Sequence, residues 1–184
     1  MKNYALKLML VTFLTTSLVG CFNSSDSENK PIDDNALLED QTSITKLRLK
    51  TVYGDIIIKL DHENAPLTSD RIRSLTKEGF YNGLSFHRVI PGHIIQTGDP
   101  TGSGDGGSGQ NIPFEKNELT HEEGTVSMAR NESDPNSADS QFFICLKKNS
   151  QLDGVYVAFG KVVEGIDVAK KITAGDKIIT LTIE

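Results

Sequence analysis

The chain has 184 residues, of which 37% are hydrophobic, and this is enough for one sizeable core together with extensions. Its formal net charge of −6 and its pI near 5.2 argue against a nucleic-acid partner. The sequence contains no internal repeat, so a repeat architecture is excluded.

Residues 1–20 are predicted to be a signal peptide. Lys2 and Lys7 stand before an apolar run from Leu8 to Leu14, which is the order found in secretory signals. The alternative is a transmembrane anchor. It is disfavoured because the stretch from Leu8 to Gly20 is shorter than the roughly 20 residues that a bilayer needs. That stretch also contains three threonines and one serine.

The predicted signal ends in Leu18-Val19-Gly20-Cys21, which resembles a bacterial lipobox. This resemblance implies cleavage before Cys21, a diacylglyceryl thioether on its sulfur and acylation of its amine. More than one acyl chain gives durable anchoring. We therefore expect a cell-envelope protein that is lipid-anchored to a bacterial membrane and faces the extracytoplasmic side. With Cys21 lipidated, no intramolecular disulfide to Cys145 is expected.

Residues 21–43 are predicted to form the lipidated cysteine and a flexible acidic tether. The segment from Phe22 to Gln41 is polar and carries six acids against Lys30 alone, so it cannot bury enough apolar surface to fold. About 20 flexible residues span roughly 25 Å on average. The tether would keep the following domain, residues 44–184, near the membrane surface.

Strand patterns begin at Ile44. Leu47 and Leu49 alternate with charged residues, and Ile56 and Ile58 repeat the same period of two. This alternation is typical of strands with one buried face, so a two-stranded hairpin is predicted.

Pro66 and Gly79 bound a predicted helix from about Leu67 to Glu78, because proline favours a helix start and glycine a helix stop. Short strands are then predicted near Ser85–Ile90, His93–Thr97, Thr125–Ala129, Gln141–Leu146, Val155–Val162 and Ile178–Ile183, with a second helix near Ile166–Ile172. The total is eight strands and two helices. The expected fold is mainly β: a closed eight-stranded antiparallel β-barrel capped by two α-helices, which would leave no exposed strand edge.

The first two of these later strands are separated by Pro91-Gly92, which suits a tight turn between antiparallel strands. With a side-chain period of two, Phe86 and Arg88 are expected to share one face of the first strand. Ile94 and Gln96 are expected to share one face of the second. The hairpin would therefore bring a cation and an amide together beside apolar groups.

Four motifs in order resemble the cyclophilin family of peptidyl-prolyl isomerases, over about residues 44–184. They are the run Ser85–Gly107, the segment Ser127–Arg130, the segment Ser140–Ile144, and Leu152-Asp153-Gly154 leading into Val157–Val162. The resemblance implies catalysis of X-Pro bond rotation in proline-containing polypeptides, with no cofactor and no metal. It also implies the capped barrel, and we expect a monomer because a closed barrel has no sticky edge.

The resemblance also implies site roles. Arg88 would be the catalytic arginine, with His87 beside it, and Gln96 would hold Arg88 and the substrate carbonyl. Phe86, Ile94, Phe143 and Leu152 would form or support the proline pocket, and Ala129, Arg130 and Gln141 would line the groove for the residues that precede proline.

Three positions depart from the family pattern. His93 stands where a pocket phenylalanine is usual, so the pocket floor is expected to be partly polar. Gln151 replaces the tryptophan of cyclosporin-sensitive members, which predicts weak cyclosporin binding. Tyr156 replaces a histidine of eukaryotic members, a change similar to other bacterial cyclophilins.

Alternatives remain at this stage. A proline-binding or chaperone module would use the same groove without turnover, and a structural lipoprotein would need no pocket. Cys145 lies in an apolar run and is interpreted as a small core residue, in preference to a nucleophile. The glycines of Gly102–Gly107 match a dinucleotide-binding pattern by letter, but no helical pattern follows them, so they are expected to fold a loop close to the groove.

Overall fold

A computed structural model describes residues 45–184, so the predicted signal peptide, lipidation site and tether lie outside the described residues. The described chain forms one antiparallel sheet of eight strands in the order β3-β4-β6-β5-β7-β2-β1-β8. The strands are β1 (Lys46–Thr51), β2 (Gly54–Leu60), β3 (Arg88–Ile90), β4 (Ile94–Thr97), β5 (Thr125–Met128), β6 (Phe142–Cys145), β7 (Ala158–Glu164) and β8 (Thr180–Ile183). The helices are α2 (Pro66–Lys77), the 3-10 turn η1 (Ser150–Leu152) and α3 (Ile166–Ala169).

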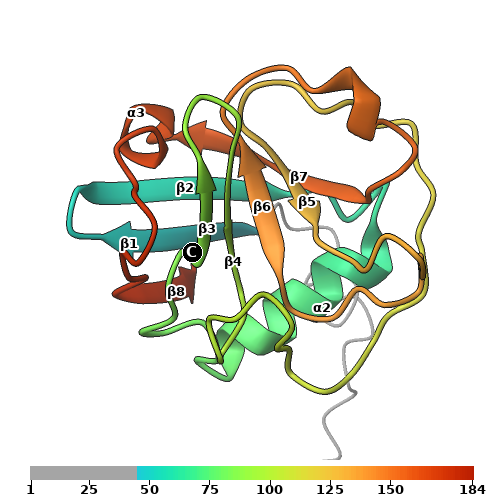
Figure 1. Cartoon of the computed structure of the whole chain (residues 1–184), viewed down its shortest axis with the longest axis horizontal. Coiled ribbons are helices and arrows are strands. Elements are labelled where there is room, and N and C mark those ends of the chain that lie inside the picture. The colour runs from blue at the N-terminus through green and yellow to red at the C-terminus, as the bar shows by residue number, and fades with distance from the viewer. Residues whose placement is uncertain (1–44) are drawn as a thin grey trace, which may run out of the picture.

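The sheet is an open, curled half-barrel, so the prediction of a closed barrel is wrong. Figure 1 shows β1 and β2 running across the direction of β3, β4 and β6, with the two ends of the sheet order, β3 and β8, unpaired with each other. Their approach is limited to one isolated antiparallel bridge between Ser85 and Lys177.

The register of that bridge explains why the barrel does not close. If the pairing of Ser85 with Lys177 continued in antiparallel order, residues 88–90 would lie opposite residues 172–174, and residues 180–183 would lie opposite residues 79–82. Neither β3 nor β8 would then lie opposite the other. The two strands therefore run away from the bridge in opposite directions. Backbone bonds near it, from Phe86 N to Asp176 O at 2.9 Å and from Ile178 N to Leu84 O at 2.8 Å, tie the edges without extending the sheet.

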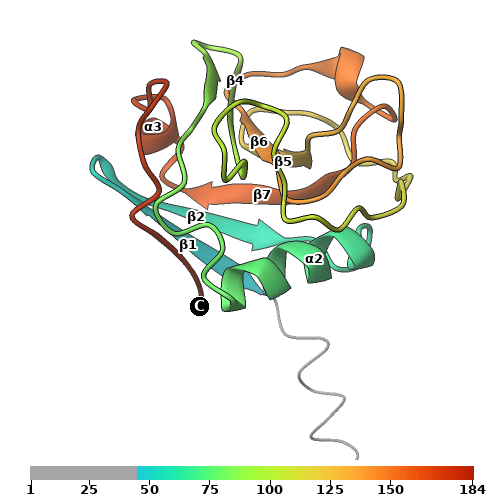
Figure 2. The same ribbon diagram turned by 60° about the horizontal axis from the view of Figure 1, so that its bottom comes forward.

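The period-two pattern of the first hairpin is confirmed. Leu47 and Leu49 lie opposite Ile58 and Ile56 in β1 and β2, and all four are buried in the main core. Helix α2 covers this core with the apolar stripe that includes Ile72, and Figure 2 shows the helix beneath β2 and β7. None of the helices within residues 45–184 is long and apolar enough to cross a membrane.

The start of α2 is capped by a residue that is far away in the sequence. Pro66 occupies the first turn as predicted, but the N-cap residue Ala65 makes no side-chain cap. Instead, the two carboxylate oxygens of Glu115 accept hydrogen bonds from the backbone N–H groups of Leu67 and Thr68, both at 2.9 Å. Free N–H groups at a helix start favour negative charge, so this carboxylate fastens the long loop between β4 and β5 to the helix.

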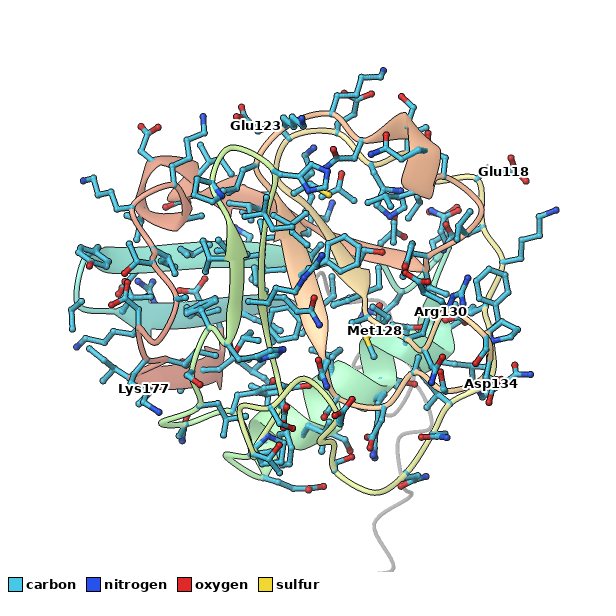
Figure 3. All side chains as sticks on the ribbon, viewed as in Figure 1. Glu118, Glu123, Met128, Arg130, Asp134 and Lys177 are labelled. Carbon is cyan, nitrogen blue, oxygen red and sulfur yellow. The ribbon has the colours of Figure 1, made fainter. Side chains whose placement is uncertain are left out.

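Removing this cap should lower stability. We expect Glu115→Ala to reduce the free energy of unfolding by about 1–2 kcal/mol, the usual cost of a lost helix cap. Urea denaturation measures this, with Glu118→Ala as the control, because Glu118 is exposed on the same loop and lies well away from α2 (Figure 3). Equal stability of the two variants would contradict the capping role of Glu115.

Candidate active site

The β3–β4 hairpin brings Arg88 and Gln96 together. The two residues lie directly opposite each other in the antiparallel register, and Arg88 Nη1 donates a hydrogen bond to Gln96 Oε1 at 3.2 Å. The Arg88 side chain is exposed, so its guanidinium remains accessible to a bound molecule. The predicted meeting of a cation and an amide on this hairpin is present.

A small apolar cluster lies on the same face of the sheet. Ile94, Phe143 and Cys145 form this cluster, which is separate from the main core, and Ala129, Leu152 and Tyr156 pack against it. Gln96 of β4 lies opposite Arg88 of β3 on one side and opposite Phe143 of β6 on the other, so Arg88 and Phe143 flank β4. Since neighbouring strands are about 4.8 Å apart, their backbones are separated by roughly 10 Å. The Gln96 side chain stands between the cation and the ring.

Phe86 does not belong to this cluster, which corrects the expectation that it shares a face with Arg88 and contributes to the pocket. Its side chain is fully buried in the main core. The period of two fails here because β3 begins at Arg88, whereas Phe86 still belongs to the segment that bonds to Asp176.

A chain of amides continues from Gln96. Its Nε2 donates to Gln141 Oε1 at 2.8 Å, and Gln141 Nε2 donates to the backbone carbonyls of Gly104 and Gly106, each at 2.8 Å. We call the three side chains of Arg88, Gln96 and Gln141 the amide relay. It connects the guanidinium to the glycine-rich loop.

The glycine-rich loop is folded around buried Asp99. The Asp99 carboxylate accepts hydrogen bonds from Thr101 N at 2.7 Å and Gly104 N at 2.6 Å. Burial by itself would raise the pKa of Asp99, but the hydrogen bonds from Thr101, Gly104 and Gly106 outweigh it and hold the pKa well below the usual range. A Cβ at Gly106 would lie 2.0 Å from Asp99 Oδ1, so glycine is required at this close approach.

The loop and the two glutamines of the relay line a hollow of about 420 Å³. Its walls include Gly104–Gly107, Gln96 and Gln141 together with Ala129 and Arg130. Arg130 lies just past the end of β5 (Figure 3), where its guanidinium donates to the Val155 carbonyl at 3.1 Å and lies 5.0 Å from the centre of the Tyr156 ring. Arg130 therefore stands between this polar hollow and the apolar cluster.

A polar triplet behind Phe143 was missed at the level of sequence. The His121 side chain is completely buried, with Nδ1 2.8 Å from Asp153 Oδ1 and Nε2 3.0 Å from Ser127 Oγ. Its ring stacks on Phe143 at 6.2 Å between centroids. The pKa of Asp153 is lowered, chiefly by the hydrogen bond from the His121 side chain. The sequence around His121 has no local pattern that predicts these contacts, because Asp153 lies 32 residues further along the chain.

The remaining polar candidates lie outside the relay. Both ring nitrogens of His87 are buried and have no hydrogen-bond partner in residues 45–184, so His87 is not linked to Arg88 by hydrogen bonds. His93 is half-buried next to β4, where its carbonyl accepts from Leu146 N. Burial raises the pKa of the Cys145 thiol, which disfavours a nucleophilic thiolate. Within the described chain, no three His, Cys, Asp or Glu side chains gather to hold a metal ion.

Comparison of the sequence with protein families matches residues 46–180 to the family described as "Cyclophilin type peptidyl-prolyl cis-trans isomerase/CLD". A peptidyl-prolyl cis-trans isomerase of Synechococcus elongatus is 41% identical over 142 residues, which cover 76% of this chain and 97% of that protein. Peptidyl-prolyl cis-trans isomerase B of Bacillus subtilis is 44% identical over 131 residues, covering 70% of this chain and 90% of that protein.

Solved structures show the same fold. The crystal structure of a cyclophilin-type peptidyl-prolyl cis-trans isomerase from Cryptosporidium parvum superposes with a TM-score of 0.71 at 32% identity, covering 77% of this chain and 98% of that one. A structure of that isomerase in the presence of the dipeptide Ala-Pro gives a TM-score of 0.69 at 33% identity, with coverage of 76% and 98%.

The lowered pKa of Asp99 predicts an acid-sensitive loop. An unfolded aspartate has a pKa near about 3.9, so the hydrogen bonds of ionised Asp99 stabilise the folded chain above roughly pH 4. That contribution is lost as the pH falls toward the lower pKa of the folded state. Asp99→Asn should cost about 1–3 kcal/mol at pH 7, because buried N–H groups lose a charged acceptor.

The measurement is urea denaturation of the wild type and Asp99→Asn at pH 7, 5, 4 and 3. We expect the stability difference between them to shrink below pH 4. A difference that stays constant down to pH 3 would show that Asp99 does not contribute through its charge.

Proposed function

The chain belongs to the cyclophilin-type peptidyl-prolyl cis-trans isomerases, and we propose that it is a lipid-anchored member that acts outside the cytoplasm of a bacterial cell. It is an enzyme that accelerates rotation about X-Pro peptide bonds. The proposed location rests on the Lys2 and Lys7 signal, the apolar run that follows it and the lipobox-like Leu18–Cys21. Its substrates would be secreted or envelope proteins as they fold.

The chemical task is rotation without bond cleavage. An X-Pro amide rotates over a barrier of about 18–20 kcal/mol and takes tens of seconds unaided, because twisting destroys the resonance between nitrogen and carbonyl. Reaching the millisecond scale requires an acceleration of about 10⁴, or about 5.5 kcal/mol of preferential binding to the twisted state. The enzyme needs groups that bind this state better than the planar one.

We assign the main electrostatic contribution to Arg88. When resonance is lost, the prolyl nitrogen gains a lone pair that a guanidinium N–H can bind, and the planar amide offers no such acceptor. One charge-assisted hydrogen bond contributes about 1.5–3 kcal/mol, so Arg88 would supply part of the required stabilisation. Desolvation and positioning would supply the rest.

The observation that carries this assignment is the placement of Arg88 beside the apolar cluster. Gln96 lies opposite both Arg88 and Phe143, so the cation and the ring stand on either side of one amide. The Cryptosporidium parvum relative was crystallised in the presence of Ala-Pro, which supports a proline-containing ligand for this family fold. A proline ring against Ile94, Phe143 and Leu152 would place its nitrogen within reach of Arg88.

A second candidate function is a proline-binding or chaperone module with little turnover. His93 favours this candidate, because it stands where the family resemblance leads us to expect a pocket phenylalanine, and a polar ring would weaken an apolar pocket floor. Both functions need Phe143 and Leu152, whereas only catalysis needs Arg88.

Removing the guanidinium should separate the two. We expect Arg88→Ala to lower kcat/KM for a short X-Pro peptide by about 10- to 150-fold, because the lost charge-assisted bond acts only in the twisted state. Two-dimensional exchange NMR on residues 44–184 measures turnover, and peptide titration measures binding. Wild-type turnover in Arg88→Ala would rule out the assigned role, and a folded wild type that binds without turnover would favour the binding module.

The lipid anchor is tested on the full-length chain expressed in a bacterium. We expect the protein to partition into the detergent phase of Triton X-114 and to incorporate labelled palmitate, and Cys21→Ala to abolish both, because the thioether forms on the Cys21 sulfur. The matched control is Cys145→Ala, which removes the buried thiol. Equal partitioning of wild type and Cys21→Ala would contradict the anchor.

A further inference from the structure

The direction of the amide relay is set by the glycine-rich loop. Gln141 Nε2 carries two protons and donates them to the backbone carbonyls of Gly104 and Gly106, each at 2.8 Å. A backbone carbonyl can only accept, so the Gln141 amide cannot be turned around without losing both bonds. Its oxygen therefore faces Gln96.

The orientation of the Gln141 amide also fixes the orientation of the Gln96 amide, which binds the Arg88 guanidinium. Because Gln141 presents Oε1, Gln96 must present Nε2 to it, at 2.8 Å. The Oε1 of Gln96 is then left to accept from Arg88 Nη1 at 3.2 Å. A reversed Gln96 would place an NH₂ group against the guanidinium, where two donors face each other and no bond forms.

The loop itself is held by Asp139. Its carboxylate accepts from Gly109 N at 2.8 Å, from Gln110 N at 3.3 Å and from Ser108 Oγ. Arg71 of α2 donates from Nη2 to the same carboxylate at 3.1 Å, to the Gln110 carbonyl at 3.1 Å and to Ser108 Oγ. The Arg71 and Asp139 side chains are each 13% exposed.

Asp139 also packs against Gly107, the residue just before Ser108. A Cβ at Gly107 would lie 2.4 Å from Asp139 Oδ2, so the backbone of Gly107 rests directly against the carboxylate. Gly106, whose carbonyl binds Gln141, is the preceding residue. The guanidinium of Arg71 is therefore connected through one carboxylate to the carbonyls that orient the relay.

We propose that Arg71 is a positioning residue for the isomerase: through Asp139 it holds the glycine-rich loop in place, and the loop carbonyls then fix the amide directions that aim Arg88. This inference rests on the proposed role of Arg88. Arg71 acts without touching the substrate, because its contacts are with Asp139 and the loop on the far side of the relay.

Arg71→Met should lower activity through the loop. With the loop released, the Gln141 amide can reverse, and Arg88 loses its fixed acceptor. We expect kcat/KM for an Ala-Pro peptide to fall about tenfold, the equivalent of about 1.4 kcal/mol. The matched control is Arg73→Met on the same helix, because Arg73 pairs with Asp70 of the same helix and is not hydrogen-bonded to the loop in residues 45–184. Its activity should stay within about twofold of wild type.

A double-mutant cycle distinguishes positioning from a general structural role. Gln141→Glu introduces a carboxylate, which presents an acceptor to Gln96 in either orientation, so the relay direction no longer depends on the loop. Whatever the effect of Gln141→Glu alone, Arg71→Met should then cost less than about twofold in that background. The same tenfold loss in both backgrounds would overturn the proposal.

Two further results complete the test. If Arg71→Met does not fold at the assay temperature, the cycle is run with Asp139→Asn, which keeps the shape of the side chain and removes its charge; the same predictions apply to it. If Arg88→Ala is inactive while Arg71→Met matches Arg73→Met, the positioning role is wrong and the isomerase assignment stands. Full activity in Arg88→Ala would instead remove the proposed role of Arg88 and, with it, the positioning role of Arg71.

Discussion

The register of β4 is the constraint on which the active site depends. Gln96 lies opposite Arg88 in β3 and opposite Phe143 in β6, so one strand sets the spacing between a cation and an aromatic ring. A slip of one residue would turn these side chains to the opposite face of the sheet. The register is secured by burial on both faces, with Ile95 in the main core and Ile94 in the apolar cluster.

Three carboxylates give order to a connection that has little regular structure. In the connection between β4 and β5, Asp99 gathers the glycine-rich loop and Glu115 fastens the chain to the start of α2. Asp139, which lies between β5 and β6, supports the continuation of the loop from outside. Long loops of this kind are usually functional when they are ordered. Here the ordered loop forms one wall of the hollow beside Arg88 and supplies the carbonyls that orient Gln141.

The site has an apolar part, the cluster around Phe143, and a polar part, the amide relay. The cluster around Phe143 offers a dry surface and is supported from behind by stacking on His121, which is itself held by Asp153 and Ser127. The relay offers directed hydrogen bonds on the other side. Because X-Pro rotation breaks no bond, a catalyst of this kind needs no nucleophile, and its rate depends on how firmly such donors are aimed.

Local pattern in the sequence determined most of the strands and the helix α2, since alternation at Leu47 and Leu49 and a proline at Pro66 act over a few residues. It also predicted the hairpin that carries Arg88 and Gln96. Their pairing depends on the three-residue connection Pro91–His93, which places Ile90 opposite Ile94, since a two-residue connection would pair Arg88 with Ile95. Tertiary structure alone decided that the sheet stays open, that Phe86 enters the core, and that Arg71 reaches Asp139 while His121 reaches Asp153. These contacts join segments tens of residues apart, whose approach depends on the packing of the whole sheet and leaves no local periodic signal.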